Sequence, residues 1–301
     1  MLGGTAVVGV LAYNYIQERS VRRGAERVFR SSHSDVLLDE HATRREPALD
    51  KPLFHERQPQ PSDAMPDERV DYVIVLRTAV GISCAAVLEP WRAIEHRFGR
   101  RALLAGSEGS GWRRILQGDF GSCTALRAAL QIVSRSGVVA DAELLEFRSA
   151  VETLAARIGA SVAAPEMRLA LEAARELDRR CAQADVQVAL HVIGELDTAA
   201  VDAALAGGAG DSSFQLARRG DGLTLVLDVP RVPDIARSYQ AMARMATHLA
   251  GTLGGRVADD RGNALDERAL AAIGAELEPM RRQLAESGIE PGSPLALRLF
   301  S

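Results

Sequence analysis

The clearest hydrophobic pattern in the chain lies between Gly222 and Asp260. A two-residue alternation predicts a strand with one buried face, formed by Leu223, Leu225, Leu227 and Val229. Pro230 and Pro233 end this strand, and Asp234 is placed to cap a helix. The apolar positions then recur with a helical period at Ile235, Tyr239, Met242, Ala246 and Leu249. A glycine pair, a short strand and an acidic pair complete the predicted order of elements.

The rest of the chain repeats this kind of order. Apolar runs predict opening strands at Asp71–Arg77 and Val186–Val192. We expect a helix to follow each one, the first beginning at Pro90 and the second capped by Asp197. Hairpins with glycine in their turns are predicted for 102–115 and 213–229. The two halves therefore look like distant copies of one module.

A second alignment supports the two copies. Leu154–Ala164 resembles Leu249–Asp259, because each ends a helix at glycine and enters a short strand. Both halves then finish with an amphipathic helix. We predict an α+β fold with two tandem modules of antiparallel sheet covered by helices on one face, at 70–184 and 185–287. In the tail at 288–301, alternating leucines at 295, 297 and 299 indicate an added edge strand.

The N-terminus predicts an N-terminal membrane helix at residues 1–18. Met1–Ile16 carries no charged side chain, and several arginines follow it, the pattern of an anchor with the remainder of the chain in the cytoplasm. This apolar run reaches only about 24 Å as a helix, against a bilayer core of about 30 Å. We therefore expect either an anchor shortened by a misassigned start or a peripheral helix. Residues 19–69 are basic at first and then rich in proline, which predicts a flexible linker. Within it, Asp35–Asp39 is a small apolar patch that docks on the head or on a partner, or has no role.

Composition and charge exclude several functional classes. The 301 residues are 47% hydrophobic and 25% charged, as in a globular protein, and a net charge of -4 gives no footprint for nucleic acid. Cys84, Cys123 and Cys181 are widely separated and odd in number, which favours a reducing compartment over a disulfide framework or a zinc site.

Candidate chemistry is sparse. The glycine run at 106–111 lacks the lysine of a phosphate loop and continues into a strand, so we interpret it as a hairpin turn. Asp259 and Asp260 have the character of turn residues. The histidines form no metal-binding spacing, and no serine or cysteine lies in a nucleophile elbow. We expect no catalytic residue, no metal, no cofactor and no small-molecule substrate, and therefore no enzyme.

The segment from Gly222 to Asp260 resembles the C-terminal domain of the ZipA family, bacterial proteins that tether the FtsZ polymer to the inner membrane. The resemblance rests on a shared order of strand, Val-Pro, helix, Gly-Gly, short strand and Asp-Asp, at Gly222, Leu223, Thr224, Val229, Pro230, Gly254, Gly255, Val257, Asp259 and Asp260. It extends from Val186 to about Ser287. It implies a split β-α-β fold, a single-pass anchor, and a non-enzymatic scaffold at the division site whose partners are the inner membrane and the C-terminal tail of FtsZ.

In this family the sheet face without helices binds the FtsZ tail. The resemblance then implies that the site comprises the outward residues of two strands: Gln187, Ala189, His191, Thr224, Val226 and Asp228. Between the strand near Phe214–Arg218 and Gly222, the family has a further strand that this chain lacks. We hypothesise that the first module supplies this wall. The alternative is a membrane-tethered peptide- or ligand-binding module of the same fold without FtsZ affinity.

Overall fold

The computed structural model describes residues 64–301 except 110, 120 and 209–212. These residues form two compact units, each with its own sheet and core. The described part of the first unit comprises 64–185 and 281–301, and the second unit is Val186–Met280. The predicted anchor at 1–18 and the apolar patch Asp35–Asp39 lie outside the described residues. None of the described helices combines the length and apolarity needed to span a membrane.

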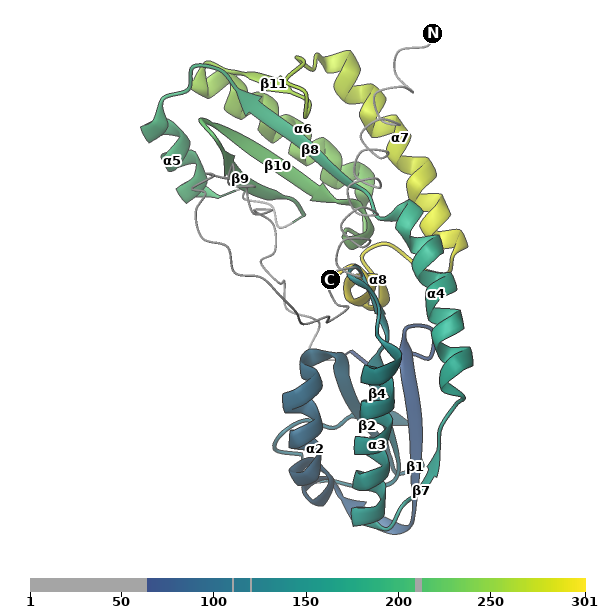
Figure 1. Ribbon diagram of the computed structural model, residues 1–301. Coiled ribbons are helices and arrows are strands. Elements are labelled where there is room, and N and C mark those ends of the chain that lie inside the picture. The colour runs from purple at the N-terminus through teal and green to yellow at the C-terminus, as the bar shows by residue number, and fades with distance from the viewer. Residues whose placement is uncertain (1–63, 110, 120, 209–212) are drawn as a thin grey trace, which may run out of the picture. The chain divides into compact units, whose positions relative to one another are not determined.

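The first unit contains a five-stranded sheet in the order β3-β2-β4-β1-β7, with every neighbouring pair antiparallel. Its strands and helices are β1 (Asp71–Ser83), α2 (Cys84–Phe98), β2 (Ala102–Ser107), β3 (Trp112–Arg114), β4 (Ser122–Gln131), α3 (Asp141–Ile158), β7 (Ser161–Ala163) and α4 (Met167–Ala184). A small hairpin of β5 (Val133–Ser134) and β6 (Gly137–Val138) leads into α3, and α8 (Pro294–Leu299) completes the unit. Figure 1 shows α2 and α3 side by side over one face of this sheet.

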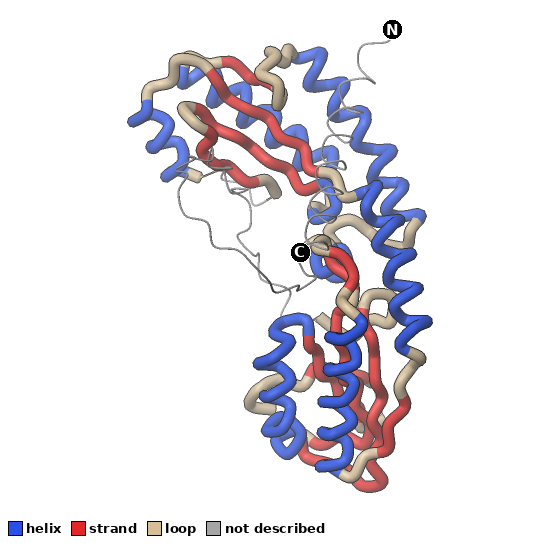
Figure 2. Tube along the Cα trace, viewed as in Figure 1, coloured by secondary structure: helices blue, strands red, loops and turns tan. Residues whose placement is uncertain are grey.

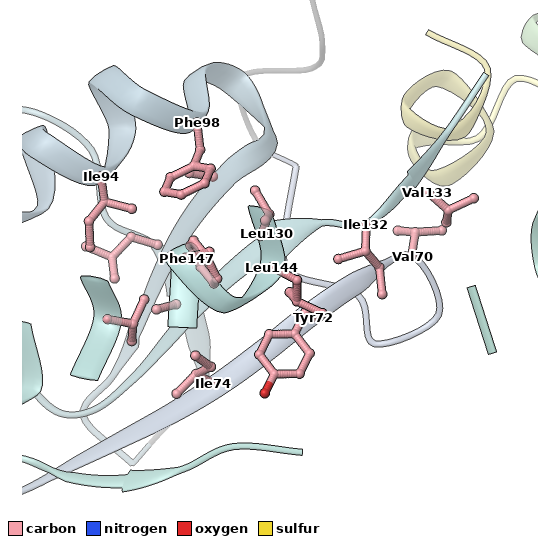
Figure 3. Packing of buried hydrophobic residues seen from close by; sticks show 14 of the residues in the cluster. Val70, Tyr72, Ile74, Ile94, Phe98, Leu130, Ile132, Val133, Leu144 and Phe147 are labelled. Atoms are coloured by element: carbon pink, nitrogen blue, oxygen red, sulfur yellow. The ribbon is translucent and has the colours of Figure 1, made fainter. Parts of the chain in front are cut away.

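The core of the first unit lies between the sheet and these two helices. Tyr72, Ile74 and Leu130 project from the strands toward α2 and α3 (Figure 3). Phe98 and Phe147 meet edge to face, with ring centroids 5.4 Å apart and an interplanar angle of 90°. The alternate residues of the same strands lie on the opposite face of the sheet, as the strand period requires.

Helix α2 begins six residues earlier than predicted. Ser83 caps it, because its Oγ accepts a hydrogen bond of 3.3 Å from the backbone N–H of Ala86. Pro90 lies inside the helix instead of starting it. The prediction was wrong because it gave Pro90 the usual first-turn position and overlooked the capping serine.

The second unit contains a four-stranded sheet in the order β11-β8-β10-β9, again with every neighbouring pair antiparallel. Its elements are β8 (Gln187–Ile193), α5 (Thr198–Gly207), β9 (Gln215–Arg219), β10 (Gly222–Asp228), α6 (Ile235–Leu253), β11 (Arg256–Ala258) and α7 (Glu267–Glu286). The final residues of α7, from Arg281, belong to the first unit. Figure 2 shows α6 lying along one face of this sheet, where it contacts β8, β10 and β11.

The helix signals in the second unit are confirmed. Asp197 and Asp234 cap α5 and α6, since their carboxylates accept from the backbone N–H groups of Ala199 and Arg237. Gly254 ends α6 in a left-handed conformation with φ of 69°. All five predicted apolar positions of α6 are buried. The α+β fold with antiparallel sheets and helices is therefore confirmed, whereas the N-terminal membrane helix is not.

The two sheets share one strand order. In the first, β2-β4-β1-β7 are neighbours; in the second, β9-β10-β8-β11 occupy the equivalent places in the same chain sequence. The first sheet adds only the short edge strand β3. This common order is the arrangement that a duplicated module would produce.

The C-terminal segment differs from the prediction. Instead of an edge strand, 294–299 form helix α8, capped by Ser293 with Pro294 in its first turn. Arg298 is 2% exposed and forms an ion pair with Asp71 at the start of β1. Ala64, which we expected in the linker, is buried, and the Arg69 guanidinium donates to the Gly288 carbonyl oxygen at 2.9 Å. The first unit therefore gathers segments from both ends of the described chain.

Candidate functional site

Strands β8 and β10 bring the six predicted site residues together. Their antiparallel register places them directly opposite one another in three pairs: Gln187 with Asp228, Ala189 with Val226, and His191 with Thr224. Residues paired in this way point to the same face of a sheet. We call this face, which looks away from α6, the outer face of the second sheet.

The alternate residues confirm the orientation of the strands. Leu190 and Leu225 are fully buried in the core of the second unit, and their strand neighbours Val188, Leu223 and Leu227 belong to the same core. None of the six predicted residues is part of that core. The period-two pattern therefore gave the correct face for every one of them.

The outer face is less accessible than an open peptide groove would be. Exposed fractions are 3% for His191, 4% for Thr224 and 8% for Val226, whereas Gln187, Ala189 and Asp228 are half-buried. The accessible part of the predicted site is thus the end that carries the Gln187–Asp228 pair. There the Gln187 side-chain amide donates to the Asp228 carboxylate at 3.3 Å.

At the other end of the outer face, the buried side chain of His191 belongs to a polar network with Thr224, Asp260 and Arg219. The His191 ring binds Thr224 Oγ1 through Nδ1 at 2.9 Å and Asp260 Oδ1 through Nε2 at 2.8 Å. Arg219, at the end of β9, also contacts Nε2 and lies 3.8 Å from Asp260 Oδ1. Because one ring nitrogen cannot donate and accept at once, these contacts define two alternative arrangements. A protonated Nε2 donates to Asp260, whereas an unprotonated Nε2 accepts from Arg219.

A line of threonine, histidine and aspartate raises the question of nucleophilic catalysis. In catalytic triads the histidine accepts the proton of a hydroxyl that faces the substrate. Here the Thr224 hydroxyl is buried within the sheet and is not presented to solvent. The network therefore fixes the side chains of one end of the face, and its geometry does not build a hydrolytic site.

The acidic pair after β11 has two different roles. Asp259 accepts hydrogen bonds from the backbone N–H groups of Arg261 and Asn263, which fold the turn. Burial raises the pKa of Asp259, but the hydrogen bonds from Asn263 and Arg261 outweigh it and hold the pKa below its usual value. The turn interpretation is confirmed for Asp259. Asp260 instead reaches the His191 ring, a contact that the sequence analysis missed.

The glycine run at 106–111 forms a hairpin turn, as the sequence predicted. The run connects β2 to β3, and Ser107 pairs with Trp112 across it. Glu108 Oε1 in this turn accepts hydrogen bonds from the backbone and side chain of Ser122. Within the described residues, no group of three or more histidine, cysteine, aspartate or glutamate side chains is placed to hold a metal ion.

Fold and site together define the second unit as a small α+β module whose sheet packs on α6 with one face and presents paired side chains from β8 and β10 on the other. Residues 215–276 match a protein-family model described as ZipA, C-terminal FtsZ-binding domain. The predicted resemblance to the ZipA family is thereby confirmed for these residues. The matched residues run from β9 into α7, so they include Thr224, Val226 and Asp228, while β8 precedes them.

The match indicates a function in cell division through FtsZ binding. The matched family is a protein-binding domain and not an enzyme family, which agrees with the expectation of a non-enzymatic protein. A search of curated proteins found no match to the chain.

Sequence reasoning missed Arg219 and Asp260 for a physical reason. Arg219 ends β9 and Asp260 lies in the turn after β11, and each approaches His191 only because β9, β10, β8 and β11 pair in one sheet. One signal was present: His191 is the only histidine that falls on a predicted strand. A histidine on the outer side of such a strand needs polar partners when it is buried.

Proposed function

We propose that the outer face of the second sheet binds the C-terminal tail of FtsZ and that the chain holds FtsZ at the cytoplasmic side of the inner membrane. The observation that carries this proposal is the family match over 215–276, which includes the β10 half of that face. The pairing of β10 with β8 supplies the other half. Binding takes place at the Gln187–Asp228 end, where the face is accessible.

The membrane part of the proposal rests on the N-terminal sequence. Met1–Ile16 is uncharged and apolar, and Arg19, Arg22 and Arg23 follow it. An anchor of this orientation places the head in the cytoplasm at the division site. Many anchored heads that face one polymer also gain avidity, which suits a shallow binding face.

Substitution of Ala189 tests the binding face. Ala189 is half-buried and lies opposite Val226, next to the accessible Gln187–Asp228 pair, so Ala189→Glu places a carboxylate on the face without filling the core. The variant should lose binding to a peptide that copies the FtsZ C-terminal tail, measured by fluorescence anisotropy. Thr247→Glu adds the same charge on the exposed side of α6 and should bind as the parent does.

Two results decide the proposal. Normal binding by Ala189→Glu would show that the face is misassigned. An absence of saturable binding by the parent protein, even at millimolar peptide, would remove FtsZ as the partner. Circular dichroism of each variant checks that the fold is retained.

One observation favours a second candidate, a tethered peptide- or ligand-binding module without FtsZ affinity. Only Gly220 and Asp221 separate β9 from β10, so the extra strand that borders the family's groove has no counterpart there. His191, Thr224 and Val226 are also too buried to line a deep groove. Saturable binding of an unrelated peptide with the FtsZ tail unbound would favour this candidate.

Membrane association has its own test. The full chain should sediment with bacterial inner membranes and resist extraction by alkaline carbonate. A variant in which Val7 and Val8 are both replaced by aspartate should be released, because charged side chains near the centre of a membrane helix are costly. Recovery of the parent chain in the soluble fraction would contradict the proposed anchor.

A further inference from the structure

The first unit carries a second sheet face with a different chemistry. We call the side of the first sheet that looks away from α2 and α3 its outer face. The strand register places five residues in its central row: Arg114, Ala105, Arg127, Val75 and Ala163. These residues come from all five strands, so the row crosses the whole sheet.

The floor of this outer face is apolar. In the row beside the central one, Leu103, Ala129 and Val73 form a hydrophobic cluster of their own, separate from the main core of the unit. In the central row, Ala105 is fully buried and Val75 is half-buried, while Ala163 at the sheet edge is exposed. The aliphatic surface that a ligand on this face can reach is therefore that of Val75 and Ala163, beside the Arg127 guanidinium.

The charged groups on the accessible rows are cationic. Arg114 and Arg127 flank Ala105, and neither forms an ion pair with any described residue. The Arg127 guanidinium lies over the Trp112 ring, 4.2 Å from its centroid. Arg77 adds an exposed positive charge one row further along β1.

Both central arginines retain an unused hydrogen-bond donor. Arg114 donates from Nη1 to the Leu104 carbonyl oxygen at 3.2 Å, but its buried Nε–H has no partner among the described residues. The buried Nε–H of Arg127 likewise has no partner there. Burial lowers the pKa of Arg114, and the nearby positive charge of Arg298 lowers it further. A carboxylate at these side chains would pair with their guanidinium groups and neutralise the charge.

One end of the face is closed. Asp71, two residues before Val73 on β1, is occupied by Arg298, and the Gln131 amide donates to the Arg298 carbonyl oxygen at 2.9 Å. Asp71 is thus already neutralised by α8. The free cations at Arg114, Arg127 and Arg77 lie beyond this closed end, along the accessible rows.

We propose that the outer face of the first sheet is a second docking surface, which binds an acidic segment of a partner protein with apolar side chains between its carboxylates. Carboxylates pair with Arg114 and Arg127, and the apolar side chains lie on Val75 and Ala163, the aliphatic residues of the central row that are accessible. These aliphatic side chains favour a peptide over nucleic acid, because a phosphate backbone has no apolar group to place there, and a vesicle experiment distinguishes the peptide from a lipid surface. This site is independent of FtsZ binding by the second unit.

A charge reversal on the full chain tests the surface. The probe is a short fluorescein-labelled peptide in which leucine and phenylalanine are flanked by glutamates, with a lysine-flanked version for comparison. The glutamate peptide should bind and the lysine peptide should not. The double variant Arg114→Glu and Arg127→Glu should weaken binding roughly 100-fold, on the basis of two lost charge-assisted pairs.

Two further variants keep the test decisive if that double variant folds poorly. Ala163→Glu adds a carboxylate at the exposed edge of the same row and should also weaken binding of the glutamate peptide. Arg92→Glu reverses a charge on the exposed side of α2, on the opposite side of the sheet, and should bind as the parent does. Equal losses with Arg92→Glu and Ala163→Glu would overturn the proposal.

A vesicle arm separates the peptide from a lipid surface. Vesicles of phosphatidylglycerol should not compete with the glutamate peptide for the parent chain. Competition that disappears in the Arg114 and Arg127 double variant would identify the face as a lipid-binding surface and overturn the peptide proposal. The same outcome with a single-stranded oligonucleotide would assign the face to nucleic acid.

Discussion

Thr224 is a buried residue of β10 whose hydroxyl has the His191 ring as its hydrogen-bond partner. It is 4% exposed, and its Oγ1 lies 2.9 Å from His191 Nδ1. Thr224→Val keeps the shape of the side chain and leaves that ring nitrogen without its partner. The substitution should lower the free energy of unfolding by about 1 to 3 kcal/mol, measured by urea denaturation.

Thr247 provides the matched control for this substitution. It lies on the exposed side of α6, where its hydroxyl donates to the Ala243 carbonyl oxygen. Thr247→Val should change the stability by only a few tenths of a kcal/mol. Equal effects of the two substitutions would show that the contact between Thr224 and His191 contributes nothing.

Tyr239 makes the second unit sensitive to alkaline pH. Its hydroxyl donates to the Leu270 carbonyl oxygen at 2.9 Å, and burial raises its pKa well above the usual 10.0. Because the folded state favours the protonated phenol, this stabilisation is fully present below pH 10 and is lost as the pH rises toward the folded value. The parent chain should therefore lose stability above pH 10.

Tyr239→Phe separates the two contributions of the phenol. At pH 8 the variant should be less stable by about 1 kcal/mol, the value of one hydrogen bond. Above pH 10 the gap should close, since phenylalanine does not ionise. Urea unfolding at both pH values measures the gap, and a gap that widens would contradict the argument.

At the residue scale, the sequence predicted the direction in which a strand side chain points better than it predicted the exposed fraction of that side chain. The alternation in β8 and β10 placed Leu190 and Leu225 correctly, because side-chain direction depends only on local strand geometry. It did not predict the burial of His191, since that depends on Asp260 and Arg219 from other elements. Local pattern cannot supply contacts between residues so far apart in sequence.

At the element scale, helix boundaries followed their capping residues. Asp234 and Gly254 predicted both ends of α6, because each carries a backbone interaction that its residue type favours. For α8, the alternating leucines suggested a strand while Ser293 and Pro294 signalled a helix start. The capping signal was the better guide, because α8 is short and packs with only some of its leucines.

Helix α8 should be a principal source of stability for the first unit. Arg298 and Asp71 are both almost fully buried, and they form a two-pronged ion pair. Arg298→Ala leaves the Asp71 carboxylate buried without its partner. The free energy of unfolding should fall by about 3 to 5 kcal/mol, measured by thermal or urea denaturation.

Asp71→Asn combined with Arg298→Met provides the control for this prediction. The double substitution removes both charges together, so it should recover part of the loss. The opposite ranking, with the double variant less stable than Arg298→Ala, would mean that the pair is not the reason for the stability of α8.

At the scale of the whole molecule, the repeated order of elements correctly anticipated two sheets of one topology. The position of 281–301 was not predictable in this way. These residues follow the second unit in sequence but contribute Leu284, Ile289 and Phe300 to the core of the first. Their apolar side chains show that they must be buried, and nothing in their pattern specifies which core receives them.

This organisation changes how the units must be separated. Cleavage near Ala184 alone should leave the two fragments associated, because Arg281–Ser301 remain packed in the first unit. Two engineered cleavage sites, after Ala184 and after Met280, are needed to release the second unit. Size-exclusion chromatography after single and double cleavage measures the difference.

Both outcomes of this cleavage experiment are informative. Dissociation after the single cut would contradict the packing of α8 in the first unit. Continued association after both cuts would support the hypothesis that the two modules form one peptide site, and free separation would remove it.

The Asp71–Arg298 pair also sets an order of events during synthesis. Domains generally fold as units while the chain is made, beginning with the N-terminal one. Here Arg281–Ser301 leave the ribosome only after Val186–Met280. The second unit therefore has all of its residues while the first still lacks α8 and the guanidinium that neutralises Asp71. The part of the protein that is translated earlier is the part whose core closes last.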